Sequence, residues 1–163
     1  MLKIIPVENG EDLRRARLLF EEYAASLDFN LCFQNFEEEL AKLPGDYTPP
    51  SGCLFLGIYD GHEAGCIALR RISRDVCEMK RLYVRPRFRG SGIGRSLAKA
   101  VIEQAKEMGY SGMRLDTVPA MERARALYAS LGFKEIPPYC HNPIPGAVFL
   151  ELKFNPGPRP AKS

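Results

Sequence analysis

A short basic segment rich in glycine is the part of the sequence best suited to bind a ligand. Residues 87–95 read Arg-Phe-Arg-Gly-Ser-Gly-Ile-Gly-Arg, with three glycines at alternate positions. Glycine lets a backbone turn tightly and approach a ligand closely, because it has no Cβ atom. Successive N–H groups in such a turn, followed by the start of a helix, bind phosphate oxygens. The pattern therefore predicts a site for a phosphate or pyrophosphate group.

The distribution of charge supports an anionic ligand at this segment. The whole chain has 23 Lys and Arg against 20 Asp and Glu, a net charge of +3. Residues 1–64 hold 5 basic and 12 acidic side chains, whereas residues 65–163 hold 18 and 8. Six basic residues and no acidic one lie between 80 and 95. The total is too small to indicate a nucleic-acid partner, so the local basic segment is the informative feature.

Two other phosphate-binding patterns fit the segment less well. A Walker loop ends in Gly-Lys-Ser/Thr, which the chain lacks. A dinucleotide-binding fingerprint needs a third glycine at a position where the chain has Arg95 or Leu97. Asp116 lies 22 residues after Gly94, near the place of a ribose-binding acid. An NAD(P)-dependent oxidoreductase therefore stays as a lesser alternative.

Two motifs resemble those of the GNAT superfamily of N-acetyltransferases. The pattern R-x-x-G-x-G at 89–94, after an expected strand ending in Leu-Tyr-Val at 82–84, resembles the acyl-CoA signature of that superfamily. The pattern A-x-x-L-Y-x-x-L-G-F at 124–133 resembles its second motif. The order of the expected elements also matches, over roughly residues 3–154. Each motif alone is moderately specific, and the two in this order are strongly so.

The resemblance implies an acetyl-CoA-dependent N-acetyltransferase without a metal. The acetyl group would pass to a primary amine, on a small molecule, a lysine or an N-terminus, by direct attack in a ternary complex. The backbone of Leu82 and Val84 would pair with the pantetheine arm, and Tyr128 would be the general acid for the leaving thiolate. The family often has Asn at the position of Met121. The expected cofactor-binding residues are Leu82, Tyr83, Val84, Arg89, Gly90, Ser91, Gly92, Ile93, Gly94, Arg95 and Tyr128.

Amine acetylation also needs a base, because a primary amine is mostly protonated at pH 7. Glu78 lies on the strand that leads to the expected cofactor site. Simple alternation places its side chain on the same face as Lys80, Leu82 and Val84. We therefore expect Glu78 to take the proton, directly or through water. The alternative is that Glu78 forms an ion pair with a neighbouring Arg or Lys.

The acceptor is expected to enter opposite the CoA, between the first two helices and the last loop. From that loop, Tyr139, His141 and Asn142 are the candidate substrate-binding residues. Acidic residues at 37–39 and 46 favour a cationic acceptor. The resemblance also implies a possible homodimer. A competing hypothesis is a non-catalytic acyl-CoA sensor or interaction module.

The elements that must position these residues follow from the hydrophobic pattern. The expected order is β-α-α-β-β-β-α-β-α-β-β, in one α/β domain (residues 1–154) with a mixed, mostly antiparallel sheet flanked by helices. The resemblance implies that the central parallel strands, ending at Val84 and Val118, splay as in the acyl-CoA N-acyltransferase fold. Asn35 and Glu38 form a capping-box pattern. Strands are expected at 3–7, 53–59, 63–71, 76–84, 113–118, 133–136 and 147–154, and helices at 11–27, 36–43, 95–108 and about 120–131.

Composition excludes several other classes of protein. With 163 residues and 45% apolar side chains, the chain suits one globular domain. Its five cysteines have no C-x-x-C spacing and its two histidines no H-E-x-x-H pattern, so we expect neither a disulfide framework nor a metal site. The N-terminus does not resemble a signal peptide and no apolar run could span a membrane. We expect a soluble, cytoplasmic protein with a flexible proline-rich tail at 155–163.

Overall fold

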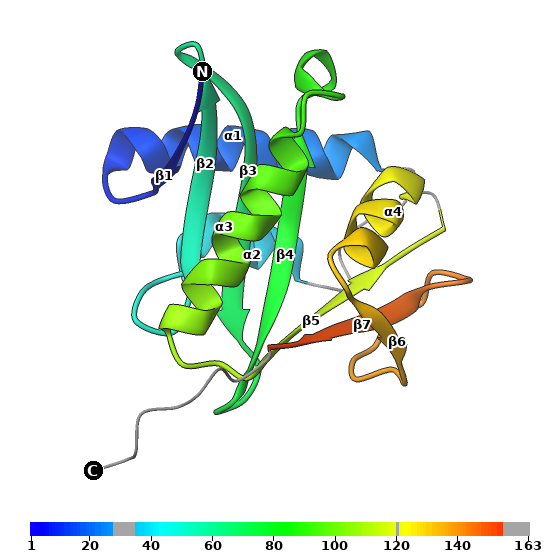
Figure 1. Cartoon of the computed structure of the whole chain (residues 1–163). Helices are drawn as coiled ribbons and strands as arrows, with labels where there is room; N and C mark the ends of the chain where they lie inside the picture. The colour runs from blue at the N-terminus through cyan, green and yellow to red at the C-terminus, as the bar shows by residue number, and fades with distance from the viewer. Residues whose placement is uncertain (28–34, 120, 155–163) are drawn as a thin grey trace.

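The computed structural model describes residues 1–27, 35–119 and 121–154. Its strands and helices follow the predicted order, with one short 3-10 turn added after the fourth strand (Figure 1). The predicted tail at 155–163 lies outside the described residues. The elements are β1 (Leu2–Pro6), α1 (Gly10–Ser26), α2 (Phe36–Lys42), β2 (Cys53–Tyr59), β3 (His62–Arg71), β4 (Val76–Val84), η2 (Pro86–Phe88), α3 (Ile93–Glu107), β5 (Gly112–Thr117), α4 (Glu122–Ser130), β6 (Lys134–Ile136) and β7 (Val148–Lys153).

The strands form one seven-stranded sheet in the order β1-β2-β3-β4-β5-β7-β6. Every neighbouring pair is antiparallel except β4 and β5, which are parallel. Figure 1 shows α3 on one face of the sheet and α1 and α2 on the other. These findings confirm the predicted α/β domain with a mixed, mostly antiparallel sheet.

The parallel strands β4 and β5 pair only at their beginnings. Residues 76–78 of β4 pair with residues 112–114 of β5. Beyond that point β4 stays paired with β3, and β5 stays paired with β7. Figure 1 shows β5 diverging from β4 after this short contact. The predicted splay is therefore present, and we call the place where the strands separate the fork.

A β-bulge in β4 changes which side chains share a face. Cys66 of β3 pairs with Tyr83, whereas Ala68 pairs with Lys80, so Ile67 alone lies opposite two residues of β4. At this bulge Arg81 has a φ of 59°, a left-handed conformation that is unusual outside glycine.

The bulge overturns one prediction. Leu82 and Val84 pack with Met79 on the α3 side of the sheet. Tyr83 packs with the residues of α1 and α2 on the other side. Because the extra residue reverses the alternation, Glu78 does not share a face with Leu82 and Val84, as simple alternation predicted.

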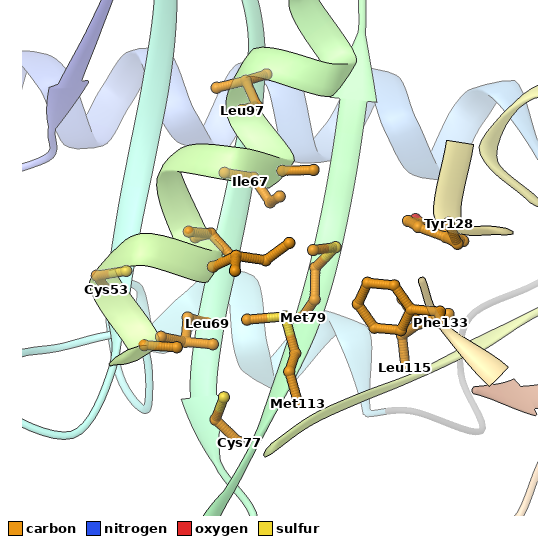
Figure 2. Packing of buried hydrophobic residues seen from close by; sticks show 14 of the residues in the cluster. Cys53, Ile67, Leu69, Cys77, Met79, Leu97, Met113, Leu115, Tyr128 and Phe133 are labelled. Carbon is orange, nitrogen blue, oxygen red and sulfur yellow. The ribbon is translucent and has the colours of Figure 1, made fainter. Parts of the chain in front are cut away.

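Hydrophobic cores lie on both faces of the sheet. On the α3 side, Leu97, Val101 and Ala105 are fully buried against β3 and β4. Figure 2 shows that Tyr128 and Phe133 continue this core toward α4. On the other side, Leu19 and Phe20 of α1 belong to a second cluster with residues from β2 and β3. Packing on both faces holds β4 and α3 rigidly beside the fork.

Two helix starts differ from the prediction. Asn35 is in the left-handed conformation and its side chain makes no capping hydrogen bond, so the predicted capping box is wrong. The acidic side chains in the first turn of α2 still suit its positive end. Helix α3 begins at Ile93, two residues earlier than predicted, because Gly92 serves as its N-cap. Within the described ranges, no helix has the length and apolar character needed to cross a membrane.

Candidate active site

The glycine-rich loop lies at the start of α3, where the sequence predicted an anion site. Gly90 and Gly92 have φ values of 89° and 83°, which glycine adopts without strain. Gly92 has no side chain to cap the helix, so the first N–H groups of α3 keep their hydrogen-bonding capacity. Arg89 and Arg95 are exposed on either side of this turn. The loop thus combines free donors, the positive end of a helix and basic side chains, as the sequence predicted.

A groove of about 720 Å³ leads from this loop toward the fork. One wall is the end of β4 and another is α4, which contributes Ala124 and Leu127. Tyr23 of α1 lies near the fork end, since it also lines the pocket described below. Among the predicted cofactor-binding residues, the groove is lined by Leu82, Tyr83, Val84, Arg89, Gly90, Gly92, Ile93 and Gly94.

The other loop residues have partners within the chain. The Ser91 hydroxyl donates to the Phe88 carbonyl at 2.9 Å. Arg95 Nη1 donates to Ser130 Oγ at 2.8 Å, which ties α3 to the end of α4. Neither Ser91 nor Arg95 is among the described residues that line the groove.

Arg89 contacts a backbone group that the sequence assigned to the ligand. Its Nε donates to the Val84 carbonyl oxygen at 2.8 Å. The guanidinium lies 5.9 Å from the centre of the Tyr83 ring. The Arg89 side chain therefore bridges the glycine-rich loop and the end of β4, and a ligand that pairs with Val84 O must share or replace this bond.

A smaller pocket of about 60 Å³ adjoins the groove inside the fork, and we call it the fork pocket. Lys80 and Leu82 line it from β4, and Asp116 lines it from β5. Tyr128 of α4 and Asn142 of the last loop close it. Groove and fork pocket share four lining residues, Tyr23, Leu82, Met121 and Ala124, so the two cavities adjoin at these residues.

Met121 occupies the position where the resembling family often has Asn. It lines both the groove and the fork pocket. The Thr117 hydroxyl donates to its sulfur at 3.8 Å. An apolar side chain therefore replaces the amide at the point where the two cavities meet.

Tyr128 is held rigidly at the wall of the fork pocket. It is buried, and its ring lies 5.7 Å from that of Phe133, as Figure 2 shows. Burial raises the pKa of the Tyr128 hydroxyl, and the charges of Tyr23 and Asp116 raise it further. The phenol therefore stays protonated at neutral pH, as a proton donor must.

Glu78 is fully engaged by other residues of the chain. Glu78 as a whole is 1% exposed to solvent. Oε1 accepts from Arg70 Nε at 2.7 Å, and Oε2 accepts from the Tyr139 hydroxyl at 2.7 Å. Burial acts to raise the pKa of Glu78, but Lys80, Arg70 and the Tyr139 hydrogen bond together lower it. Glu78 is not among the described residues that line the groove or the fork pocket.

Side chains of the last loop reach β4 and β5 at the fork. The Tyr139 ring packs edge-on against Phe149, with centroids 5.4 Å apart, and its hydroxyl reaches Glu78. Asn142 Nδ2 donates to Asp116 Oδ2 at 2.9 Å. His141 is exposed to solvent. The loop thus brings Tyr139 and Asn142, two of the three candidate substrate-binding residues, to the fork. There they donate hydrogen bonds to the carboxylates of Glu78 and Asp116.

Most of the acidic charge expected to attract a cation is already paired. Glu39 accepts two hydrogen bonds from the buried Arg81, at 2.9 and 2.8 Å. Glu38 pairs with Lys42 at 2.7 Å, and an Asp46 oxygen lies 3.9 Å from Arg70 Nη1. The acidic segment therefore gives less support to a cationic acceptor than the sequence indicated.

Asp116 and Lys80 both line this pocket, which the sequence did not predict. The sequence pattern suggested Asp116 only as a ribose-binding acid and Lys80 only as a neighbour of Glu78. Burial, and then the charge of Arg81, lower the pKa of Lys80. Their positions in the sequence could have indicated this, since Lys80 and Asp116 lie on the two strands that were expected to diverge.

Comparisons with known proteins agree with this geometry. The model of the acetyltransferase (GNAT) family matches residues 16–133. An uncharacterised N-acetyltransferase of Schizosaccharomyces pombe is 39% identical over 156 residues, which cover 94% of this chain and 96% of that protein. Human N-acetylaspartate synthetase is 36% identical over 115 residues, which cover 66% of this chain and 38% of that longer protein.

Solved structures show the same fold. An acetyltransferase from Streptococcus agalactiae superposes with a TM-score of 0.76 at 21% identity, covering 94% of this chain and 98% of that chain. A GNAT acetyltransferase from Elizabethkingia anophelis, solved with acetyl-CoA bound, has a TM-score of 0.65 at 23% identity, covering 94% and 98%. Residues of both sequence motifs line the adjoining groove and fork pocket. Because the family model spans most of the chain, the chain belongs to the GNAT family of acetyltransferases.

Proposed function

We propose that the protein transfers an acetyl group from acetyl-CoA to a primary amine. The observation that carries this proposal is the pair of adjoining cavities, the groove at the start of α3 and the fork pocket lined by Tyr128. Their order matches the order of groups in acetyl-CoA, in which a pyrophosphate is joined by a long amide arm to a thioester.

The residues present fit acetyl-CoA along the whole groove. The pyrophosphate would accept hydrogen bonds from the first N–H groups of α3, beside Arg89. The amide arm would lie along the end of β4, which has no strand partner on the β5 side after Glu78 among the described pairings. Backbone groups of Leu82 and Val84 would then add the arm to the sheet like a further strand.

Transfer would proceed by direct attack. The acceptor nitrogen bonds to the thioester carbonyl carbon, the C–S bond breaks, and Tyr128 donates its proton to the departing sulfur. No step needs an acyl-enzyme intermediate. The role of Glu78 as base remains a prediction, and its contacts with Arg70 and Tyr139 favour the ion-pair alternative that the sequence left open.

Two measurements on the wild-type protein test the proposal. CoA should raise the melting temperature, and acetyl-CoA should release free thiol when a suitable amine is present. A chain that CoA does not stabilise would contradict the proposed acyl-CoA site. Stabilisation without thiol release, across the whole amine panel, would instead indicate the acyl-CoA sensor.

The acceptor panel should include amines of different charge. The ion pairs of Glu38, Glu39 and Asp46 weaken the argument for a cationic acceptor. Relatives named N-acetylaspartate synthetase are, by that name, producers of an acetylated amino acid. We therefore place aspartate beside polyamines and peptides with free lysine or N-terminal amines. A homodimer and a cytoplasmic location remain predictions that light scattering and cell fractionation would test.

A further inference from the structure

The fork pocket contains a carboxylate that the proposed mechanism does not use. Asp116 lies on β5, is half-buried, and lines this pocket together with Tyr128 and Lys80. Its backbone pairs with Phe149 of β7, on the side away from β4. Because β4 has already separated from β5 at this point, the Asp116 side chain borders a cavity.

Asp116 is also held in place by the last loop. Asn142 Nδ2 donates to its Oδ2 at 2.9 Å, and Asn142 Oδ1 accepts from the Ile144 N–H at 3.0 Å. The amide is thereby fixed to its own loop and oriented toward Asp116. This arrangement restricts the rotation of the carboxylate beside Tyr128.

The charge of Asp116 reaches the groups that surround the pocket. Burial is the largest cause that raises the pKa of the Tyr128 and Tyr139 hydroxyls, followed by Tyr23 for Tyr128 and Glu78 for Tyr139, and the Asp116 charge raises both further. It also opposes the lowering of the Lys80 pKa. The titratable groups that face Asp116 are Lys80 of β4, Tyr23 of α1, Tyr128 of α4, and Tyr139 and Cys140 of the last loop.

Glu78 and Asp116 differ in whether an acceptor in the fork pocket can contact them. Both Glu78 oxygens accept short hydrogen bonds, and the residue is 1% exposed. Asp116 borders the cavity that contains the Tyr128 side chain. A group that takes a proton from the acceptor must contact it, and only Asp116 of these two carboxylates lines the pocket.

We propose that Asp116 binds the ammonium group of the acceptor and takes its proton in the fork pocket, which makes this pocket the amine subsite. The inference rests on the proposed acetyltransferase function. An ammonium acceptor loses two protons in forming an amide. The first passes to Asp116 and on to water, which leaves a neutral nitrogen to attack the thioester. The second replaces the proton that Tyr128 gives to the CoA sulfur. Asn142 is the positioning residue for Asp116.

The test compares Asp116→Asn with wild type in thiol release at saturating acetyl-CoA, between pH 6 and 10. At pH 7 we expect kcat/KM for the amine to fall by about 100-fold or more. The deficit should shrink as the pH approaches the pKa of the acceptor amine, because solution then supplies the neutral form. The CoA-induced rise in melting temperature should remain, since Asp116 is not among the described residues that line the groove.

Two further variants keep the result interpretable. Glu78→Gln should lose less activity than Asp116→Asn, and its loss should not shrink with rising pH. Asp116→Ala should regain part of its rate when formate supplies the missing carboxylate, whereas wild type should not respond to formate.

Three outcomes would overturn the inference. One is an Asp116→Asn enzyme within threefold of wild type, the second a deficit that does not change with pH, and the third an Asp116→Ala enzyme that formate does not rescue. A wild-type protein that CoA stabilises but that releases no thiol overturns the proposed function itself, and this inference with it. The wild-type measurement therefore separates the two failures.

Discussion

At the residue scale, Tyr128 is a core residue that the proposed function also makes the proton donor. Its ring belongs to the hydrophobic core beside Phe133, which fixes its direction. Its surroundings raise the pKa of the hydroxyl, chiefly through burial, so the proton is kept until a stronger base forms nearby. Sequence periodicity alone would assign this residue to the core, and only the motif at 124–133 suggested a role in proton transfer.

Replacing Tyr128 with Phe should separate these two roles. The ring contact with Phe133 persists, so the melting temperature and the affinity for CoA should change little. Loss of the proton donor should reduce kcat by about 100-fold or more. Tyr110→Phe is the matched control, because it removes another buried hydroxyl, which donates to Ser51 O. Equal kcat values for Tyr128→Phe and wild type would remove Tyr128 from the mechanism.

At the scale of elements, the bulge in β4 decides what faces the fork. Arg81 adopts a left-handed conformation at this bulge, and its buried guanidinium pairs with Glu39 of α2. That partner lies 42 residues away in the sequence. The order of strands and the splay were predictable from local hydrophobic pattern and the family resemblance. The bulge was not, because no local pattern indicates it and the contact that Arg81 makes there is with a residue distant in the sequence.

The pair between Arg81 and Glu39 should matter greatly for stability. The Arg81 side chain is 2% exposed, so Glu39→Gln leaves a buried guanidinium without its principal carboxylate. We expect the free energy of unfolding to fall by about 3 kcal/mol, measured by urea denaturation. The neighbouring variant Glu38→Gln is the control, since its pair with Lys42 is exposed and should contribute little. Equal decreases in the free energy of unfolding for Glu39→Gln and Glu38→Gln would contradict a special stabilising role for the buried pair.

The loop before α3 should bind CoA well only when Gly92 keeps its left-handed conformation. An Ala side chain at Gly92 meets no atom within 4 Å, but the φ of 83° disfavours it. The strain of about 1–2 kcal/mol should weaken CoA binding by about 5- to 30-fold, measured by calorimetry. Gly61→Ala is the control, because Gly61 has a φ of 84°, equally open space, and a place in the β2–β3 turn. Weakened binding in both variants would point to a general loss of stability.

At the scale of the whole molecule, both faces of the sheet pack a hydrophobic core, but they differ beside the fork. On the α3 side, Leu82 and Val84 at the end of β4 line the groove. The opposite face carries charged residues beside the fork, with Arg70, Glu78 and Tyr139 linking β3, β4 and the last loop. The sequence identified Glu78 and Tyr139 as candidates, but neither Arg70 nor the hydrogen bonds among the three, because the loop at 137–147 has no periodic pattern to place it.

This network predicts how the molecule responds to acid. Burial opposes ionisation of Glu78, but Lys80, Arg70 and Tyr139 more than offset it, so the pKa of the folded state lies below the ordinary value of 4.5. A lowered carboxylate pKa contributes stability that is complete above that ordinary value and is lost as the pH falls through the folded value. The urea midpoint of wild type should therefore exceed that of Glu78→Gln at pH 7, and the difference should narrow at pH 3.5. A difference that stays constant would mean that Glu78 acts through packing, because packing, unlike its charge, does not depend on a proton.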